Sequence, residues 1–398
     1  MHSSDEIQFL ILASEPSPEK VSKDLLPELV PKIERWNWLI ECAVRNSVAP
    51  LIFYNLQATG VIKDLQPKYR DIFKQHYKNS SIRNLKLRSI FIEIAEKLLS
   101  NGIEIIALKG IALQHELYSS PALRPMIDID LLVKEDKLEQ ALHILIEIGC
   151  KTPVYSESKY IDSLKHHYPP LFYKGVSIEL HRSLVDAYDP VKIPIRLIWE
   201  KAKKRQIEGL EVLTIELNQQ LLYLCHHVYS TLRGGSVKLI WYVDIIVFLR
   251  KNFSKIQVEQ FKQLTDNSNA KESVYHSLGT ANYLFKEHFF ENELNSEIDK
   301  YCPRPQEILL YIEKTKAGEE LIHYYQKFIN IKSISGKLRY LQNRMFPSVN
   351  YVKRKYKTTG YTSLSAGYLR EFVSFISLGI RIVVKKLILK VNTKKRVE

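Results

Sequence analysis

The sequence predicts an α+β fold that is mostly helical, with a small mixed-sheet α/β domain embedded between helical segments. Two observations predict this fold. Apolar residues recur at helical spacing through most of the 398 residues. Between residues 101 and 188 this pattern changes to short β-branched or alternating runs that are separated by helical stretches. Because strands and helices alternate only there, we expect one small α/β unit with helical partners on either side.

Residues 1–100 are predicted to form helices. The stretch over 24–48 is interrupted by Pro27 and Pro31 and then carries apolar residues at helical spacing. A second amphipathic stretch ends at Gly102, a residue type that often ends helices.

The segment 101–188 is predicted to contain three strands and two helices. The run "IEIIAL" ends at Lys109-Gly110, and "MIDIDLLV" follows a loop with two prolines. The run "EDKLEQALHILIEIG" opens with acids and closes at Gly149, as the helix dipole favours. We expect strands over 103–108, 126–133 and 176–181, and helices over 111–118 and 135–149.

The rest of the chain is expected to form a helical domain over 189–330 and a basic, largely helical region over 331–398. The chain has a formal net charge of +14. From Ile331 to Glu398 there are 16 Lys and Arg but only two acids, Glu371 and Glu398. The first 330 residues are therefore neutral, and the basicity belongs to the C-terminal region.

The cysteine pattern indicates a reducing compartment. Four cysteines lie far apart with no CxxC pair, whereas disulfide frameworks and zinc sites need closer clusters. The first ten residues lack a basic region followed by a long apolar run, so no secretory signal is expected. We expect a cytoplasmic protein, with a peripheral membrane location as a variant of that prediction.

Two aspartates stand inside the apolar run "MIDIDLLV". Side chains at i and i+2 of a strand share a face, so Asp128 and Asp130 would lie together while Ile127, Ile129 and Leu131 fill the other face. Two close carboxylates repel each other and resist desolvation, and a hard divalent cation such as Mg²⁺ removes both penalties.

A third acid, Glu179 in "VSIELH", follows Asp130 by 49 residues. Three acids on neighbouring strands could hold two metal ions for in-line phosphoryl or nucleotidyl transfer. The alternative is that Asp128 and Asp130 face solvent on an edge strand, and a DxD pair alone favours that alternative. The metal site gains weight from the turn at Lys109-Gly110, where helix N-terminal amides could cradle phosphate.

The run "LKGIALQHELYSSPALRPMIDIDLLV", followed by "IELH", resembles the bacterial nucleotidyltransferase family within the polymerase-beta-like superfamily. That superfamily is marked by a glycine turn, a DxD strand and a later third carboxylate. The resemblance covers about residues 103–185, with weaker similarity in "VAPLIFYNL", "LLYLCHHVYSTL" and "LIWYVDIIVFL". It implies an NTP donor such as ATP, two Mg²⁺ ions (or Mn²⁺), and transfer of a nucleoside monophosphate with release of pyrophosphate.

The resemblance also implies roles for single residues. Asp128 and Asp130 would bind both metal ions, and Glu179 would complete the second metal site and help to deprotonate the acceptor hydroxyl. Gly110 would let the backbone approach the triphosphate. The superfamily's serine after the glycine is replaced here by Ile111, so Lys109 would supply a charge instead.

Three further residues have open roles. Arg124 could bind the triphosphate, since a guanidinium suits phosphate, or could pair with Asp128. His181 shares the face of Glu179 and could orient it or touch a phosphate, although a structural hydrogen bond is the favoured role. Asp244, a lone acid in an apolar helix, needs a partner among Lys238, Arg233 and His227, or else lines the acceptor pocket.

The other histidines are expected to be structural. His166-His167 and His226-His227 are adjacent pairs, and neighbours on a helix diverge too far to chelate one metal ion.

The C-terminal segment from Tyr368 to Val391 is too charged to span a bilayer, with Arg381, Lys385 and Lys386 near its middle. As a helix it has one polar stripe on a mostly apolar surface. It is expected to pack on the protein, with an anionic membrane surface as the alternative. Nucleic acid is disfavoured because aromatic residues do not alternate with the basic ones.

The leading hypothesis is an Mg²⁺-dependent nucleotidyltransferase acting on a small molecule, sugar, peptide or protein. One rival is a nucleotide-sugar glycosyltransferase that uses the DxD motif. Such enzymes place an α/β nucleotide-binding fold before that motif, whereas this chain is helical there. The other rival is a non-catalytic nucleotide-binding or tethering module.

Overall fold

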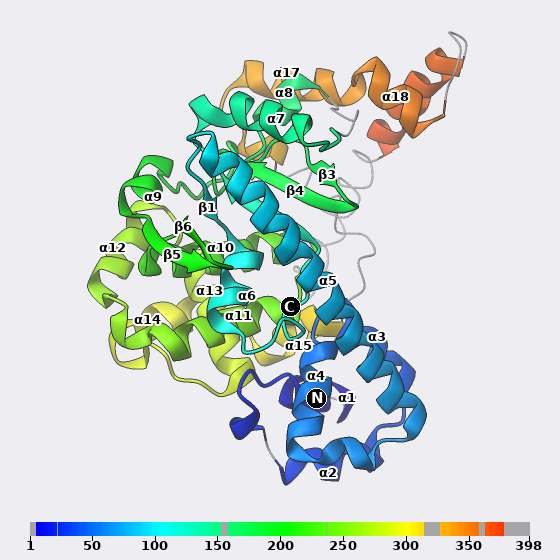
Figure 1. Ribbon diagram of the computed structural model, residues 1–398, viewed down its shortest axis with the longest axis vertical. Coiled ribbons are helices and arrows are strands. Elements are labelled where there is room, and N and C mark those ends of the chain that lie inside the picture. Colours follow the sequence, from blue (N-terminus) through cyan, green and yellow to red (C-terminus); the bar gives the residue numbers. More distant parts are fainter. Residues whose placement is uncertain are drawn as a thin grey trace, which may run out of the picture.

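A computed structural model describes residues 5–21, 23–152, 158–235, 237–313, 327–357 and 363–377 of the chain. The described part is mostly helical and has one six-stranded mixed sheet, which confirms the predicted fold class (Figure 1). The expected domain boundaries stay a prediction.

The N-terminal part is a set of helices around an apolar core. Pro31 lies in a 3₁₀ turn and interrupts this stretch as predicted, whereas Pro27 lies inside the short helix Leu25–Leu29 and does not interrupt it. The longest helix, α5, runs from the N-terminal helices to the sheet (Figure 1). These helices are α1 (Asp5–Ala13), α2 (Leu25–Leu29), α3 (Trp36–Arg45), α4 (Ala49–Thr59) and α5 (Pro67–Ser100), with 3₁₀ turns η1 (Pro18–Lys20), η2 (Val30–Lys32) and η3 (Val61–Asp64).

The sheet has the strand order β3-β4-β2-β1-β6-β5. The pairs β2–β4 and β1–β6 are parallel, and the other neighbours are antiparallel. The first strand is shorter than expected and covers two residues. The strands are β1 (Ile106–Ala107), β2 (Asp128–Leu132), β3 (Leu171–Tyr173), β4 (Val176–His181), β5 (Lys203–Ile207) and β6 (Leu210–Thr214).

The hairpin of β5 and β6 corrects the prediction that residues 189–330 are wholly helical. Glu208 (φ 53°) and Gly209 (φ 83°) form a two-residue turn in the left-handed region, a conformation that suits tight hairpins. Ile207 and Val212 alternate with polar residues and are buried in the core beneath the sheet. Because β6 also pairs with β1, the hairpin extends the sheet beyond the predicted α/β segment.

The faces of the sheet meet different cores. Ile129 and Leu131 of β2 pack with α5 and α7, whereas Leu132 packs with the helices that follow the sheet. Ile127 was expected to join the apolar face, but it precedes β2 and is 64% exposed. The helices between strands are α6 (Lys109–Leu117), α7 (Leu138–Glu147), α8 (Lys159–Ser163) and α9 (Ile195–Lys201), with η4 (Glu135–Lys137) before α7.

The helices after β6 share one apolar core with the N-terminal helices. Buried aromatic side chains are its largest members. These helices are α10 (Leu217–Arg233), α11 (Leu239–Asn252), α12 (Val258–Asn267), α13 (Lys271–Phe285), α14 (Glu291–Tyr301) and α15 (Pro305–Glu313), with η5 (Phe253–Lys255) after α11.

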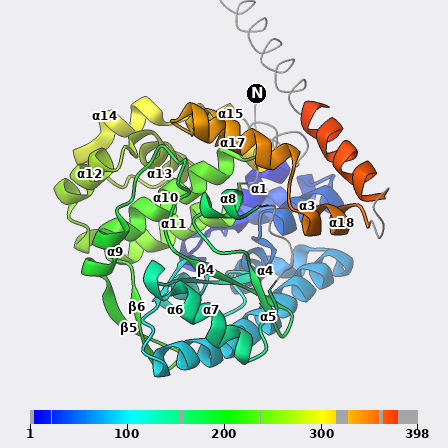
Figure 2. The same cartoon turned by 90° about the horizontal axis from the view of Figure 1, so that it is seen from above.

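The C-terminal region is helical where it is described. It contains α17 (Ile334–Met345), α18 (Val349–Lys355) and a helix over 363–377, which lies at the margin beside α18 (Figure 2). The predicted basic positions Arg381, Lys385 and Lys386 fall outside the described residues. Over the described ranges, no helix is long and apolar enough to cross a membrane.

Candidate active site

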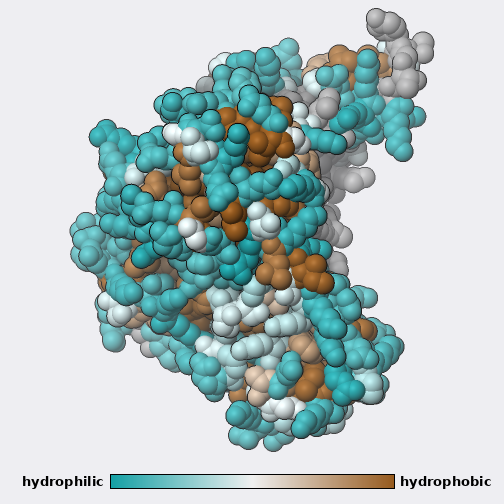
Figure 3. Space-filling view, viewed as in Figure 1, coloured by the Kyte–Doolittle hydropathy of each residue, from teal (hydrophilic) through white to brown (hydrophobic). Residues whose placement is uncertain are grey.

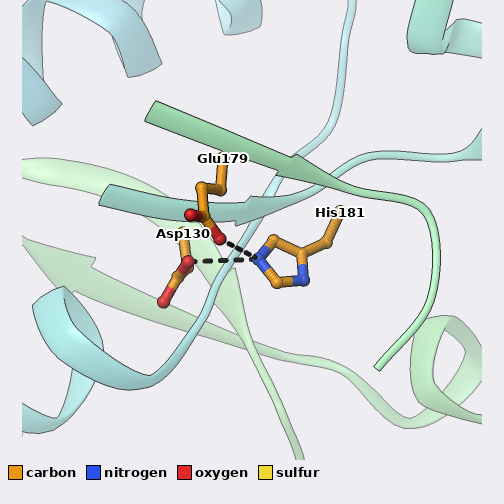
Figure 4. Close-up of side chains that lie close together, drawn as sticks. All are labelled: Asp130, Glu179 and His181. Carbon is orange, nitrogen blue, oxygen red and sulfur yellow. Dashed lines mark hydrogen bonds and ion pairs between the residues drawn. The ribbon is translucent and has the colours of Figure 1, made fainter. Parts of the chain in front are cut away.

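Two acidic residues meet on neighbouring strands. The parallel register of β2 and β4 pairs Asp128 with Ser177 and Asp130 with Glu179. Because paired residues project to the same face of a sheet, the carboxylates of Asp130 and Glu179 lie next to each other (Figure 4). Asp128 is two residues from Asp130 and shares its face.

His181 contacts both carboxylates. Its Nε2 lies 3.1 Å from Oδ1 of Asp130 and 3.7 Å from Oε2 of Glu179 (Figure 4). One ligand atom from each of these three residues lies within 4.8 Å of the others, a spacing that one metal ion could bridge. Asp128 is not a member of this tight group. The structure therefore places the ring of His181 against two of the acids that the sequence singled out.

Asp128 is the acid whose ionised form the neighbouring carboxylates disfavour. Burial and the charges of Asp130 and Glu179 raise the pKa of Asp128 to about 7. Burial would also raise the pKa of Asp130, but the hydrogen bond and charge of His181 lower it below its ordinary value. Burial would likewise raise the pKa of Glu179, but the hydrogen bond of His181 lowers it below its ordinary value. A divalent cation would relieve the repulsion at Asp128, so the residues present fit such an ion.

Lys109 brings a positive charge to the acids. It is the first residue of α6, and its Nζ lies 4.9 Å from the ring centroid of Tyr223 on α10. Burial would lower the pKa of Lys109, but Tyr223 and the charges of Asp130 and Glu179 raise it above its ordinary value. Lys109 is therefore cationic at neutral pH.

Gly110 lies against the loop that precedes β2. A Cβ at this position would lie 3.3 Å from Sδ of Met126 and 3.6 Å from Nη1 of Arg124. Glycine thus lets the first turn of α6 pack closely on this loop. Its approach to a triphosphate stays a prediction.

Arg124 and Asp244 form a buried ion pair. Nε and Nη2 of Arg124 each donate to one oxygen of Asp244 at 2.8 Å, and the hydroxyl of Tyr118 donates to Oδ1 at 2.6 Å. The prediction that Asp244 pairs with Lys238, Arg233 or His227 is wrong, as is the alternative pairing of Arg124 with Asp128. The sequence gives no sign of this pair, because its members are 120 positions apart.

Arg124 still lines the cavity, whereas Asp244 is not among the lining residues. Nε and Nη2 of Arg124 each donate a hydrogen bond to Asp244, and Nη1 is directed toward the turn at Gly110. A contact of Arg124 with phosphate therefore depends on Nη1 and on the second hydrogen of Nη2.

His166 and His167 do not lie on a helix, so the geometric reason for setting them aside was wrong. The segment pairs with the end of β4: the amide of Tyr168 donates to the carbonyl of Leu180 at 2.8 Å. The ring centroids of His166 and His167 lie 5.1 and 5.6 Å from that of His181.

Both histidines have one ring nitrogen engaged. Nδ1 of His166 bonds to Asp186, and Nδ1 of His167 lies 2.7 Å from the carbonyl oxygen of Tyr168. Each Nδ1–H therefore donates to an oxygen, which leaves Nε2 as the acceptor nitrogen of the ring. Burial lowers the pKa of His166 to about 4, although Asp186 opposes this shift.

A cavity of about 780 Å³ is lined by Asp128, Asp130 and Glu179 and by the neighbouring basic residues. Its walls come from the acidic strands, from α10 and α11, and from α5 with the α3–α4 connection. Trp241 of α11 lines it, with the ring of His227 edge-on at 4.9 Å. The basic residues that line the cavity are Arg83, Lys109, Arg124, Lys165, Lys238 and Lys327. Such a cavity suits an anionic ligand that carries a ring.

The structure brings together Lys109, Asp128, Asp130, Glu179 and His181 as the sequence predicts. It adds residues that the sequence left out, namely Tyr223, His227, Ser230, Thr231 and Trp241. A signal existed on α10, where polar residues recur at helical spacing in an otherwise apolar helix and so share one face.

A family model described as "Uncharacterised nucleotidyltransferase" matches residues 33–286. The match runs from the N-terminal helices through the whole sheet to the end of α13, and thus includes every strand of the candidate site. No curated protein and no solved structure matches the chain.

Proposed function

Because the chain belongs to the family of uncharacterised nucleotidyltransferases, we propose that it moves a nucleoside monophosphate from an NTP to an acceptor with release of pyrophosphate. Membership of the wider polymerase-beta-like superfamily is part of this proposal. The acceptor is a small molecule, sugar, peptide or protein with a free hydroxyl.

The observation that carries the proposal is the pairing of Asp130 with Glu179 on adjacent parallel strands. With Asp128 on the same face, three carboxylates gather in a cavity that is otherwise rich in cations. This mixture suits an NTP, because its phosphates bind cationic side chains and its metal ions bind carboxylates.

Asp128, Asp130 and Glu179 would hold Mg²⁺, or Mn²⁺ in its place. When bound, the divalent cations would neutralise charge that develops on the phosphate oxygens during transfer. The position of His181 against Asp130 makes it a positioning residue, since its Nε2–H donates to Oδ1 and fixes the carboxylate.

The cationic residues would hold the donor. Lys109 lies beside the acids and is suited to a phosphate near the point of transfer. Trp241 offers an aromatic surface for a nucleobase, a type of contact that tolerates different bases. The acceptor oxygen attacks the α-phosphorus, the bond to the β-phosphate oxygen breaks, and pyrophosphate leaves while the hydroxyl proton passes to a base.

The test is incubation with each labelled NTP, Mg²⁺ and a cell extract, in which transfer of label and pyrophosphate release are measured. We expect release by the wild type and a loss of at least about a hundredfold in Asp128→Asn/Asp130→Asn. The matched control is Glu211→Gln, an exposed acid on β6 outside the cavity, which should keep wild-type activity.

Three outcomes contradict the proposal in different ways. Pyrophosphate release that survives in the double variant would place the site elsewhere. Consumption of a nucleotide sugar in place of an NTP would favour the glycosyltransferase. Binding of NTP without turnover in any extract would favour a non-catalytic module.

A further inference from the structure

The helix over 363–377 has an apolar stripe that faces solvent. Leu369, Val373 and Ile376 are 63%, 57% and 45% exposed. Their spacing of i, i+4 and i+7 places them along one side of the helix. We call these three residues the C-terminal stripe. It lies outside the cavity of the proposed active site.

The opposite side of the same helix is fixed to the protein. Both carboxylate oxygens of Glu371 accept from Nζ of Lys355 at 2.9 and 2.7 Å, and one also accepts from the hydroxyl of Tyr356 at 2.6 Å. The hydroxyl of Tyr368 donates to the carbonyl of Pro347 at 2.9 Å. These bonds hold the C-terminal stripe outward.

The part of the chain that carries the C-terminal stripe is strongly basic. Between residues 331 and 377 the described chain has nine Lys and Arg and a single acid, Glu371. That acid is buried and paired with Lys355, so it does not offset the surface charge. Exposed cations of this region are Lys353 on α18, Lys357 just after it and Arg370 on the helix itself.

The arrangement is visible on the surface. Apolar side chains lie among hydrophilic ones on the arm around α18 (Figure 3), and the helix over 363–377 forms the edge of the molecule (Figure 2). Exposed aliphatic side chains in a strongly basic region, where the single described acid between residues 331 and 377 is buried, complement an anionic lipid surface. A nucleic acid would make use of aromatic side chains next to the cations, and the stripe is aliphatic.

We propose that the C-terminal stripe and the cations beside it bind an anionic membrane surface. The cations contact lipid phosphates while Leu369, Val373 and Ile376 enter the boundary between headgroups and acyl chains. The protein then lies on the membrane without crossing it. Binding weakens with salt, because exposed charges are screened, and it needs both the charges and the apolar side chains.

The test uses the full chain and sedimentation with vesicles. We expect the wild type to sediment with vesicles of equimolar phosphatidylglycerol and phosphatidylcholine, and to stay in solution with phosphatidylcholine alone. Leu369→Glu/Val373→Glu should lower the partition coefficient by at least about tenfold, because it removes apolar insertion and adds repulsion. Both positions are exposed, so the fold should be kept, and circular dichroism and the melting temperature check this.

The matched control is Ile82→Glu/Leu85→Glu on α5, which makes the same chemical change at positions that are 67% and 53% exposed. It should bind vesicles as the wild type does. Absence of wild-type binding to the anionic vesicles would overturn the proposal, as would equal binding by the stripe variant and the wild type. Binding of single-stranded RNA without vesicle binding would identify a nucleic-acid surface instead.

Discussion

At the residue scale, Glu179 is the most informative position of the site. Its carboxylate lies opposite Asp130 and is held near it by His181. Loss of one charge from the proposed metal ligands should damage the transition state more than the binding of the nucleotide.

For Glu179→Gln we expect near-complete loss of turnover with NTP affinity largely kept. The measurement is pyrophosphate release together with NTP binding by calorimetry. Ser177→Ala, two residues earlier on the same face of β4, is the matched control and should retain turnover. Survival of turnover in Glu179→Gln would show that the third ligand is misassigned.

Substitutions in the buried ion pair of Arg124 and Asp244 test whether this pair stabilises the fold. Asp244→Asn leaves the Arg124 guanidinium buried without its partner charge, which should lower the free energy of unfolding by about 3–5 kcal/mol. Arg124→Met/Asp244→Leu removes both charges and should recover most of that loss. The measurement is urea denaturation of both variants.

The same double variant separates the two roles of Arg124. If Nη1 also binds phosphate, Arg124→Met/Asp244→Leu will be stable and yet will bind NTP more weakly than the wild type. Equal affinity would restrict Arg124 to its structural role.

The ion pair of Glu6 and Arg35 makes the stability of the fold depend on pH. The hydrogen bonds from Arg35 lower the pKa of Glu6 from 4.5 to about 2, so the folded state favours the carboxylate. A lowered pKa stabilises the fold above pH 4.5, and this contribution disappears as the pH falls toward 2. Because Arg35 is 54% exposed, we expect a contribution of only about 1 kcal/mol.

Glu6→Gln should therefore lower the free energy of unfolding by about 1 kcal/mol at neutral pH. The difference from the wild type should stay constant down to about pH 5.5 and shrink by about pH 3.5. Denaturant titrations at several pH values measure it. If the difference in free energy of unfolding increased as the pH fell, the prediction would be wrong.

At the scale of elements, the hairpin of β5 and β6 completes the sheet at the edge next to β1. Its turn depends on Gly209, whose φ of 83° lies in the left-handed region. A Cβ there meets no neighbouring atom within 4 Å, so the cost of a substitution comes from the backbone alone.

Gly209→Ala should destabilise the protein by about 1–2 kcal/mol through this backbone cost. Glu211→Ala on the same hairpin, which loses only an exposed pair with Lys204, should change stability by less than about 0.5 kcal/mol. Thermal or urea unfolding compares them. Equal effects would show that the turn conformation is not what Gly209 supplies.

At the scale of the whole molecule, the cavity joins segments that are distant in the chain. Residues from α5, from the acidic strands and from α10 and α11 line it together. A ligand bound there contacts all three walls, so it should stabilise the folded chain as a unit.

An NTP with Mg²⁺ at about a hundred times its dissociation constant should raise the free energy of unfolding by about 2.7 kcal/mol. The melting temperature measures this effect. A chelator should remove most of it in the wild type, and Asp128→Asn/Asp130→Asn should show little of it. The same shift with and without the chelator would show that nucleotide binding does not use the metal ions.

The sequence by itself determined the fold class and singled out the acidic residues of the candidate site. Helical spacing, strand alternation and the separation of Asp128 from Asp130 are local properties, so they can be read within a few residues. The pattern of "VSIELH" likewise marked Glu179 and His181 as neighbours on one face.

Only the tertiary structure decided which distant residues meet. The partner of Asp244 is Arg124, 120 residues away, and the hairpin of β5 and β6 became part of the sheet by pairing with β1. The contact of the Lys109 ammonium with the ring of Tyr223 also joins distant parts of the chain. The physical reason is that periodicity fixes which face a side chain occupies, whereas packing of whole elements fixes what lies opposite that face.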